Sequence, residues 1–157
     1  IHKVNRAKEL QMPLKFYEDL SAFKLFLLDC GLFGCMVDAP AKQMLISDNI
    51  FKEFKGAFTE QFVLQQLVAN EMLPYYWSSD STPAEIDFAI QTEERVIPIE
   101  VKAEENVKSR SMRTYIDKHP NYDLKGLRIS MKGYDVQDWL ENIPLYGISK
   151  YFFTYAE

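Results

Sequence analysis

The segment from Gly56 to Lys102 constrains the fold most, because a helical pattern is followed there by three strand-like runs. Apolar side chains recur at helical spacing in residues 56–73, and Pro74 stands just past the end of this pattern. The runs that follow are short and largely apolar, and the segments SDSTPA and QTEE between them have the composition of turns. One helix and three strands are therefore predicted, and the strands cover Tyr75–Ser79, Glu85–Ile90 and Arg95–Lys102.

A second helix and a fourth strand complete the predicted core. Residues 109–119 place apolar side chains on one helical face, Ser109 can serve as the N-cap, and Pro120 stops the helix. Residues 124–131 have a strand pattern, and a closing strand or turn with a short helix follows. The order helix, three strands, helix, strand predicts an α/β fold with a mixed sheet and a C-terminal helical segment. The first fifty residues form an extension of irregular pattern, in which AFKLFLLD is a strand or a short buried segment.

Length and composition favour one globular domain. The chain has 157 residues and 47% hydrophobic residues, and its longest apolar run is far too short to cross a bilayer. The two cysteines, Cys30 and Cys35, have no partner at metal-ligand spacing, so we expect reduced thiols and a cytoplasmic protein. The first residue is Ile1 rather than Met, so we expect a fragment of a longer protein, a processed product or a partly ordered chain.

The distribution of charge is uneven along the chain. The net charge of −5 argues against nucleic-acid binding by the whole surface. Residues 102–132, however, contain eight Lys and Arg against four Asp and Glu. One region can therefore face a polyanion while the remainder repels it.

The strand VIPIEVKA carries a carboxylate and an ammonium on one face. Side chains two residues apart on a strand point the same way, so Glu100 and Lys102 share a face while Ile97, Ile99 and Val101 point into the core. In the preceding run, EIDFAI, the apolar residues do not all fit a simple alternation. If the two strands pair as a hairpin across QTEE, Asp87 lies beside Glu100.

Glu60 adds a third carboxylate at the edge of the apolar stripe of the first helix. Two unit charges about 4 Å apart repel by about 4 kcal/mol at an effective dielectric of about 20, so three converging carboxylates need a counter-ion. Mg²⁺ or Mn²⁺ supplies it and leaves coordination positions for water. Such an ion, with a nearby lysine, suits phosphodiester hydrolysis.

This order of residues and elements resembles the PD-(D/E)xK nucleases, which have a restriction-endonuclease-like αβββαβ core. More narrowly, the chain from Phe23 onward is similar to a C-terminal domain of uncharacterised function found behind an AAA-type ATPase module in bacterial and archaeal proteins. The motifs that carry this similarity are FKLFLLDCGL, GAFTEQFVLQQL, YYW, EIDFAI, IPIEVKAEEN, SRSMRTY and IPLYGI.

The resemblance implies roles for four residues and a division of the chain. It implies that Asp87 and Glu100 are catalytic metal ligands, that Glu60 completes the metal site, and that Lys102 is the catalytic lysine. It also implies that residues 1–22 are the tail of a preceding segment, often a winged helix, that residues 23–157 are the nuclease-like domain, and that an ATPase module lies upstream. The chain has no GxxxxGK[ST] phosphate loop, so we expect no ATP hydrolysis by these residues.

Each candidate residue also has an ordinary structural interpretation. A Glu-x-Lys pair on a strand is commonly a solvated pair, Glu60 near a helix start is favoured by the helix dipole, and Glu85 is a surface residue or a fourth acid. The start of the second helix is either a solvated face or a phosphate site. The DNA-binding candidates there are Lys108, Ser109, Arg110, Ser111 and Arg113.

Three functions follow from these alternatives. The first is a Mg²⁺-dependent or Mn²⁺-dependent deoxyribonuclease, and the second is a nuclease-derived domain that binds DNA without cutting it. The third is a catalytically silent protein-interaction module coupled to the ATPase. A purely structural domain whose acids lie on the surface is the remaining interpretation.

Overall fold

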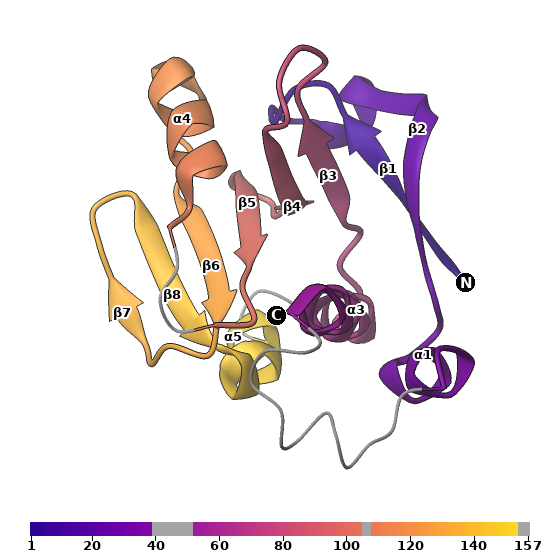
Figure 1. Cartoon of the computed structure of the whole chain (residues 1–157). Helices are drawn as coiled ribbons and strands as arrows, with labels where there is room; N and C mark the ends of the chain where they lie inside the picture. The colour runs from indigo at the N-terminus through magenta and orange to yellow at the C-terminus, as the bar shows by residue number, and fades with distance from the viewer. Residues whose placement is uncertain (39–51, 105–107, 154–157) are drawn as a thin grey trace.

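The computed structural model describes residues 1–38, 52–104 and 108–153 and has one eight-stranded mixed sheet (Figure 1). The order of strands across the sheet is β2-β1-β3-β4-β5-β6-β8-β7. The strands are β1 (His2–Ala7), β2 (Glu18–Phe26), β3 (Tyr75–Ser78), β4 (Glu85–Gln91), β5 (Val96–Val101), β6 (Gly126–Ser130), β7 (Asp135–Val136) and β8 (Leu140–Pro144). The α-helices in these ranges are α1 (Cys30–Met36), α3 (Lys52–Ala69), α4 (Arg110–Lys118) and α5 (Ile148–Phe153).

The predicted core order is confirmed as α3, β3, β4, β5, α4, β6. The pairs β3–β4 and β4–β5 are antiparallel, so they are joined by short turns. The pair β5–β6 is parallel and needs a long crossover, which α4 provides. The closing strand β8 continues the parallel pairing beside β6, and α5 follows it after a short 3₁₀ turn.

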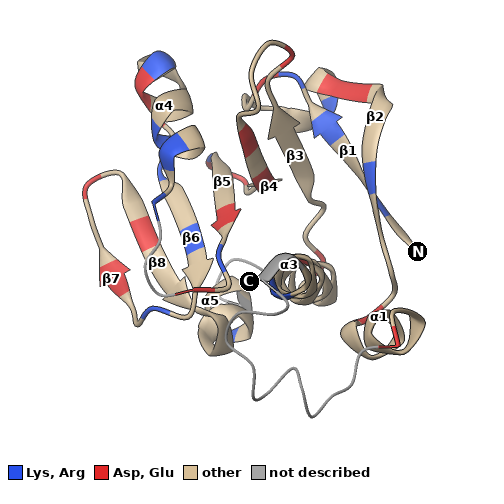
Figure 2. Cartoon of the chain, viewed as in Figure 1, with Lys and Arg blue, Asp and Glu red and all other residues tan. Residues whose placement is uncertain are grey.

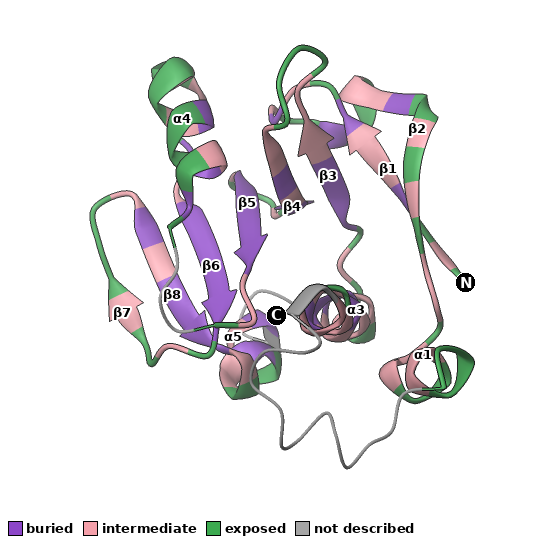
Figure 3. Cartoon of the chain, viewed as in Figure 1, coloured by how far each residue is buried: buried purple, intermediate pink, exposed green. Residues whose placement is uncertain are grey.

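Buried side chains form one cluster on each face of the sheet, and Figure 3 shows β5 and β6 buried along their whole length. Ile97, Ile99 and Val101 of β5 pack in the cluster that includes α3 and α5, as their alternation predicts. Val96 belongs to the cluster that includes α4. Because both faces of β5 are covered, a charged side chain on this strand is held in a largely dry environment.

The N-terminal extension is more regular than its sequence pattern predicts. β1 pairs antiparallel with β2 and parallel with β3, and the 3₁₀ turn η1 (Leu14–Tyr17) lies between β1 and β2. The predicted buried segment AFKLFLLD coincides in part with β2, which is an edge strand with exposed Leu20 and Leu25. β2 runs through residue 22, and the division of the chain at that residue stays a prediction.

A β-bulge lies in β4 beside the candidate site. Tyr75 pairs with Ala89 while Trp77 pairs with Ile86, so two steps along β3 correspond to three along β4. The extra residue explains why EIDFAI does not alternate simply. Asp87 lies within this interval, and a bulge at such a place redirects a side chain relative to a regular strand.

Two smaller predictions concern the thiols and the membrane. Cys30 is half-buried, Cys35 is exposed, and both are free thiols. Within the described ranges, no α-helix is long and apolar enough to cross a bilayer.

Candidate functional site

Asp87 and Glu100 are brought together by the β4–β5 hairpin. Phe88 pairs with Ile99, so Asp87 and Glu100 are the next residues outward on the two strands. The backbone N–H of Val101 donates to Asp87 Oδ2 at 2.7 Å. The charge of Asp87 also raises the pKa of Glu100, after the larger effect of burial. The hairpin predicted from QTEE therefore gathers these two carboxyl groups.

Lys102 lies beside Glu100, as the two-residue spacing predicts. Its Nζ is 2.6 Å from Glu100 Oε1. Glu100 is only 5% exposed, and its second oxygen, Oε2, is buried without a hydrogen-bond partner among the described residues. A buried carboxylate oxygen without a partner loses the free energy of hydration. A ligand that contacts Oε2 would replace that lost interaction.

Glu60 joins this group from α3, together with a lysine from the N-terminal extension. Lys24 of β2 forms an ion pair with Glu85, and its Nζ is 3.9 Å from Glu60 Oε2. We call Lys24, Glu60, Glu85, Asp87, Glu100 and Lys102 the acidic cluster. Glu85 is therefore a paired member at the edge of the cluster.

The electrostatics of the acidic cluster follow from burial and from an excess of carboxylates over ammonium groups. Burial, and then the charge of Asp87, raise the pKa of Glu60 to about 7. Burial is also the largest influence on Asp87 and Glu100, whose pKa values are raised. Burial is the largest single influence on the pKa of Lys102 and lowers it, but the hydrogen bond with Glu100 and the nearby carboxylate charges together outweigh burial, so the net pKa is raised. Lys102 is therefore an ammonium at neutral pH.

The acidic cluster suits a divalent cation that is bound by two carboxylates rather than three. Among the described residues, no group of three or more His, Cys, Asp or Glu side chains is arranged to hold a metal ion. Mg²⁺ is commonly bound through one or two carboxylates and keeps several waters. Asp87 and Glu100, with the unpaired Oε2, meet that requirement, and the role of Glu60 as a third ligand stays a prediction.

The predicted DNA-binding residues lie at the start of α4, close to β6. Lys108, Ser109, Arg110 and Arg113 line a cavity of about 520 Å³, and Ser111 does not. Figure 2 shows basic residues on α4 and on the neighbouring strand β6. The basic residue of β6 is Arg128, the register partner of Glu100.

Lys24 and Trp139 were not predicted as site residues, and Arg128 was predicted only as part of the basic region. Lys24 lies in an apolar run of the extension, whose pattern gives no sign that it faces Glu85. Arg128 is a single charge within the strand GLRIS and is 5% exposed. A lone charge between apolar neighbours on a predicted strand was a usable signal. Trp139 lies in a loop, where spacing carries no information.

His119 packs between two aromatic rings at the end of α4. Its ring stacks on Tyr115 and lies tilted against Tyr122, with centroid distances of 4.2 and 4.8 Å. Its Nδ1 is 2.8 Å from the carbonyl oxygen of Tyr115. The imidazole is thus held by α4 and the turn after it.

Comparison with known proteins gives one positive result. No curated protein matches the chain. A family model described as a domain of unknown function, DUF4143, matches residues 55–151, which include most of α3, all of the strands from β3 to β8, and α4. This match covers more than half of the chain and contains every acidic-cluster residue except Lys24, so the chain belongs to the DUF4143 family.

Proposed function

We propose that this chain is the nuclease-like C-terminal domain of a DNA-associated AAA-type ATPase, and that Asp87 and Glu100 hold Mg²⁺ or Mn²⁺ for phosphodiester hydrolysis. The observation that carries the proposal is the buried, unpaired Oε2 of Glu100 beside Asp87 and Lys102. The cluster contains more carboxylates than ammonium groups, so a cation would relieve its repulsion. The resemblance to the PD-(D/E)xK nucleases supports the same residues.

Each residue of the proposed site has a distinct task. A bound divalent ion would polarise a phosphoryl oxygen and activate a water molecule. The Val101 N–H orients Asp87 through its hydrogen bond to Oδ2. Lys102 stays protonated, so its ammonium offsets negative charge on the phosphoryl group and does not act as a base. Perturbed pKa values of this kind are typical of functional sites.

The test combines metal binding with cleavage. The wild-type chain is titrated with Mn²⁺ by calorimetry and incubated with supercoiled plasmid in Mg²⁺ or Mn²⁺. Asp87→Asn and Glu100→Gln are expected to abolish metal binding and nicking while the circular dichroism spectrum is unchanged. Glu94→Gln, in the exposed turn between β4 and β5, removes the same charge outside the cluster and is the matched control. Loss of nicking in the control as well would contradict the assignment.

DNA binding without cleavage is the second candidate, and the ion pairs of the cluster favour it. Lys102 already contacts Glu100, and Lys24 already contacts Glu85, so much of the negative charge is compensated without a metal. In that case the wild type binds DNA with an affinity that falls steeply with salt, and no divalent metal supports nicking.

The protein-interaction alternative is distinguished by the same measurements. The edge strand β2 exposes Leu20, Phe23 and Leu25, which are 70%, 47% and 62% exposed. A chain that binds neither metal nor DNA would favour a role in which such a surface contacts the upstream ATPase module or another protein.

A further inference from the structure

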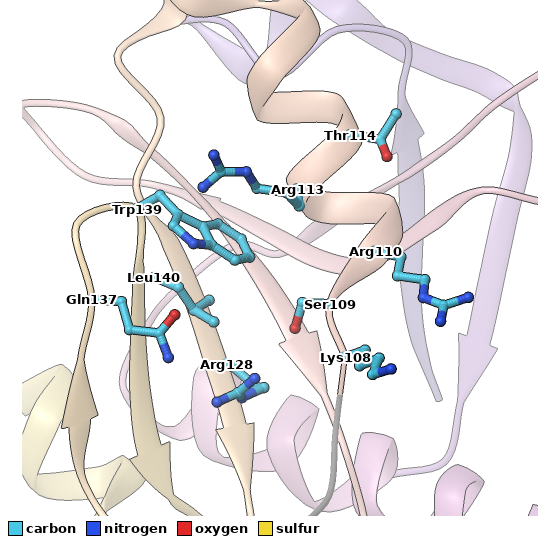
Figure 4. A pocket seen from close by; sticks show the side chains of 9 residues that line it. All are labelled: Lys108, Ser109, Arg110, Arg113, Thr114, Arg128, Gln137, Trp139 and Leu140. Atoms are coloured by element: carbon cyan, nitrogen blue, oxygen red, sulfur yellow. The ribbon is translucent and has the colours of Figure 1, made fainter.

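The cavity at the start of α4 is a second site, separate from the acidic cluster. α4, β6 and the segment before β8 form its walls, and Figure 4 shows Ser109, Arg128 and Trp139 around one space while Arg110 points away from it. Four of these side chains are basic, namely Lys108, Arg110, Arg113 and Arg128, and none of the described residues that line it is acidic. Its volume of about 520 Å³ suits a small anionic group rather than a protein surface.

Ser109 is the residue that points to a ligand. It is the N-cap of α4, but its side chain makes no capping hydrogen bond. The residue is 6% exposed, and within the described structure its Oγ is buried without a hydrogen-bond partner. Figure 4 shows this hydroxyl pointing into the space above Arg128. A buried hydroxyl without a partner costs free energy that an acceptor in the cavity would recover.

The helix start adds donors of the same kind. α4 has nine residues, and the first N–H groups of a helix have no partner within the helix. Because Ser109 does not cap them, they are open to an anion, which the helix dipole also favours. Lys108 and Arg110 are exposed and form no ion pair with any described residue. Lys108 directly precedes Ser109, and the first N–H groups of α4 directly follow it, so these donors are close to the Ser109 hydroxyl along the chain.

Arg128 and Trp139 form the opposite wall. The Arg128 Nε donates to Asn142 Oδ1 at 2.8 Å, which fixes the guanidinium on β6. Arg128 is 5% exposed, so its charge is held in poorly solvated surroundings, and this burial lowers its pKa. The guanidinium carbon of Arg113 lies 4.8 Å from the Trp139 ring centroid, so this arginine is positioned along the wall. A positioned, desolvated arginine is the type of group that binds phosphate oxygens.

We propose that this cavity binds a phosphoryl group of a nucleic-acid strand, through Ser109, the first backbone N–H groups of α4, Lys108 and Arg128. The inference rests on the proposed function only for the polymer that carries the phosphate. It needs no metal, so it is tested in the presence of a chelator, where the proposed cleavage cannot occur. Failure of cleavage and failure of phosphate binding are therefore separate results.

The experiment follows the two tryptophan indole N–H signals of the full chain by NMR, assigned with Trp77→Phe. Inorganic phosphate is expected to shift the Trp139 signal saturably and to leave the Trp77 signal in place. Ser109→Ala and Lys108→Gln are each expected to raise the dissociation constant about tenfold, as for the loss of one charge-assisted hydrogen bond. Lys118→Gln, at the other end of α4, removes the same charge as Lys108→Gln and should change it less than about twofold.

Two oligonucleotides of one sequence then identify the source of the phosphate. Equal binding of the 5′-phosphorylated and 5′-hydroxyl strands supports an internal phosphodiester, and binding of the phosphorylated strand alone supports a terminal phosphate. If Ser109→Ala does not fold, the comparison of Lys108→Gln with Lys118→Gln decides alone. The proposal is overturned if Trp139 does not respond, if Lys118→Gln weakens binding as much as Lys108→Gln, or if phosphate binds but neither oligonucleotide does.

Discussion

Glu60 shows how strongly position can change a single ionisable group. It faces Asp87 and is partly buried on α3, and its pKa is raised from 4.5 to about 7. A carboxyl group with a raised pKa binds its proton more tightly in the folded chain than in the unfolded chain. The stability that it contributes is complete below about pH 4.5 and is lost as the pH rises through about 7.

We therefore predict that Glu60→Gln flattens the pH dependence of stability. In the presence of a chelator, the free energy of unfolding of the wild type falls between pH 4.5 and 7, and the variant lacks this part of the decrease. At pH 8 the free energy of unfolding of the variant should exceed that of the wild type by on the order of 1–2 kcal/mol, after allowance for partial solvation. Urea unfolding across the pH range measures it, with Glu94→Gln as the control. Parallel curves for Glu60→Gln and wild type would contradict the prediction.

The candidate residues that could be predicted are those tied to strand periodicity. The spacing of Glu100 and Lys102 follows from the strand period, and the position of Asp87 beside them follows from a short turn. The burial of Arg128 could be inferred from its apolar neighbours, but the partners of Lys24 and Arg128 come from other segments of the chain. Neither local propensity nor spacing encodes such contacts.

At the scale of elements, Gly126 sets the approach of α4 to β6. A Cβ atom at this position would lie 2.9 Å from both Cε and Sδ of Met112 and 3.2 Å from Cδ1 of Leu140. Met112 is fully buried in the cluster under α4, so its side chain has little room to move. The lack of a side chain at Gly126 thus lets the helix that begins at Ser109 pack closely on the sheet.

Gly126→Ala should destabilise the chain by about 1–2 kcal/mol, because the added methyl group overpacks this contact. Gly133→Ala is the matched control, since a Cβ atom at that position meets nothing within 4 Å. Denaturant unfolding at one pH measures both variants. Equal free energies of unfolding for the two variants would show that the Met112 side chain moves aside without a loss of stability.

The elements from α3 to β6 were predicted because their apolar patterns are regular and their turns have distinctive composition. The predicted start of α3 at Gly56 is wrong, because the helix already includes Lys52, and Gly weakens a helix without ending it. β1 and β2 were missed or only partly predicted. β2 is an edge strand with apolar residues on its exposed side, and the register of β1 with β2 shifts between Asn5 and Arg6. Both features hide the two-residue period.

At the scale of the whole molecule, the first 22 residues are part of the core. Val4, Ala7, Leu10 and Leu14 are at most 1% exposed. The Leu10 N–H donates to Tyr115 Oη at 3.0 Å, which links this segment to α4. Arg6 contacts Asp19 and Asp80 at 2.6 Å each, which ties β1 to β2 and to the turn before β4.

A chain that begins at Phe23 should lose cooperative folding. Each fully buried aliphatic side chain contributes roughly 1.5–3 kcal/mol to the free energy of unfolding. The loss of Val4, Leu10 and Leu14 together with the rest of β1 is therefore expected to cost more free energy than the whole stability of many domains. Removal of Ile1 alone, which is 82% exposed, is the control and should leave the melting transition unchanged. Thermal unfolding followed by circular dichroism measures both. A sharp transition in the shorter chain would instead support residue 22 as a domain boundary.

The pairing of Glu100 with Arg128 on adjacent strands has a consequence for how the two sites behave together. Each of these charges alters the pKa of the other, so a ligand that changes the charge beside one residue also changes the electrostatic potential at the other. An anion bound near the Arg128 guanidinium would weaken the positive potential that disfavours a cation at the Glu100 carboxylate. By thermodynamic reciprocity, the cation would strengthen retention of the anion by the same factor. Polymer and metal would then act as mutual positive effectors, and an assay that omits one would understate the affinity for the other.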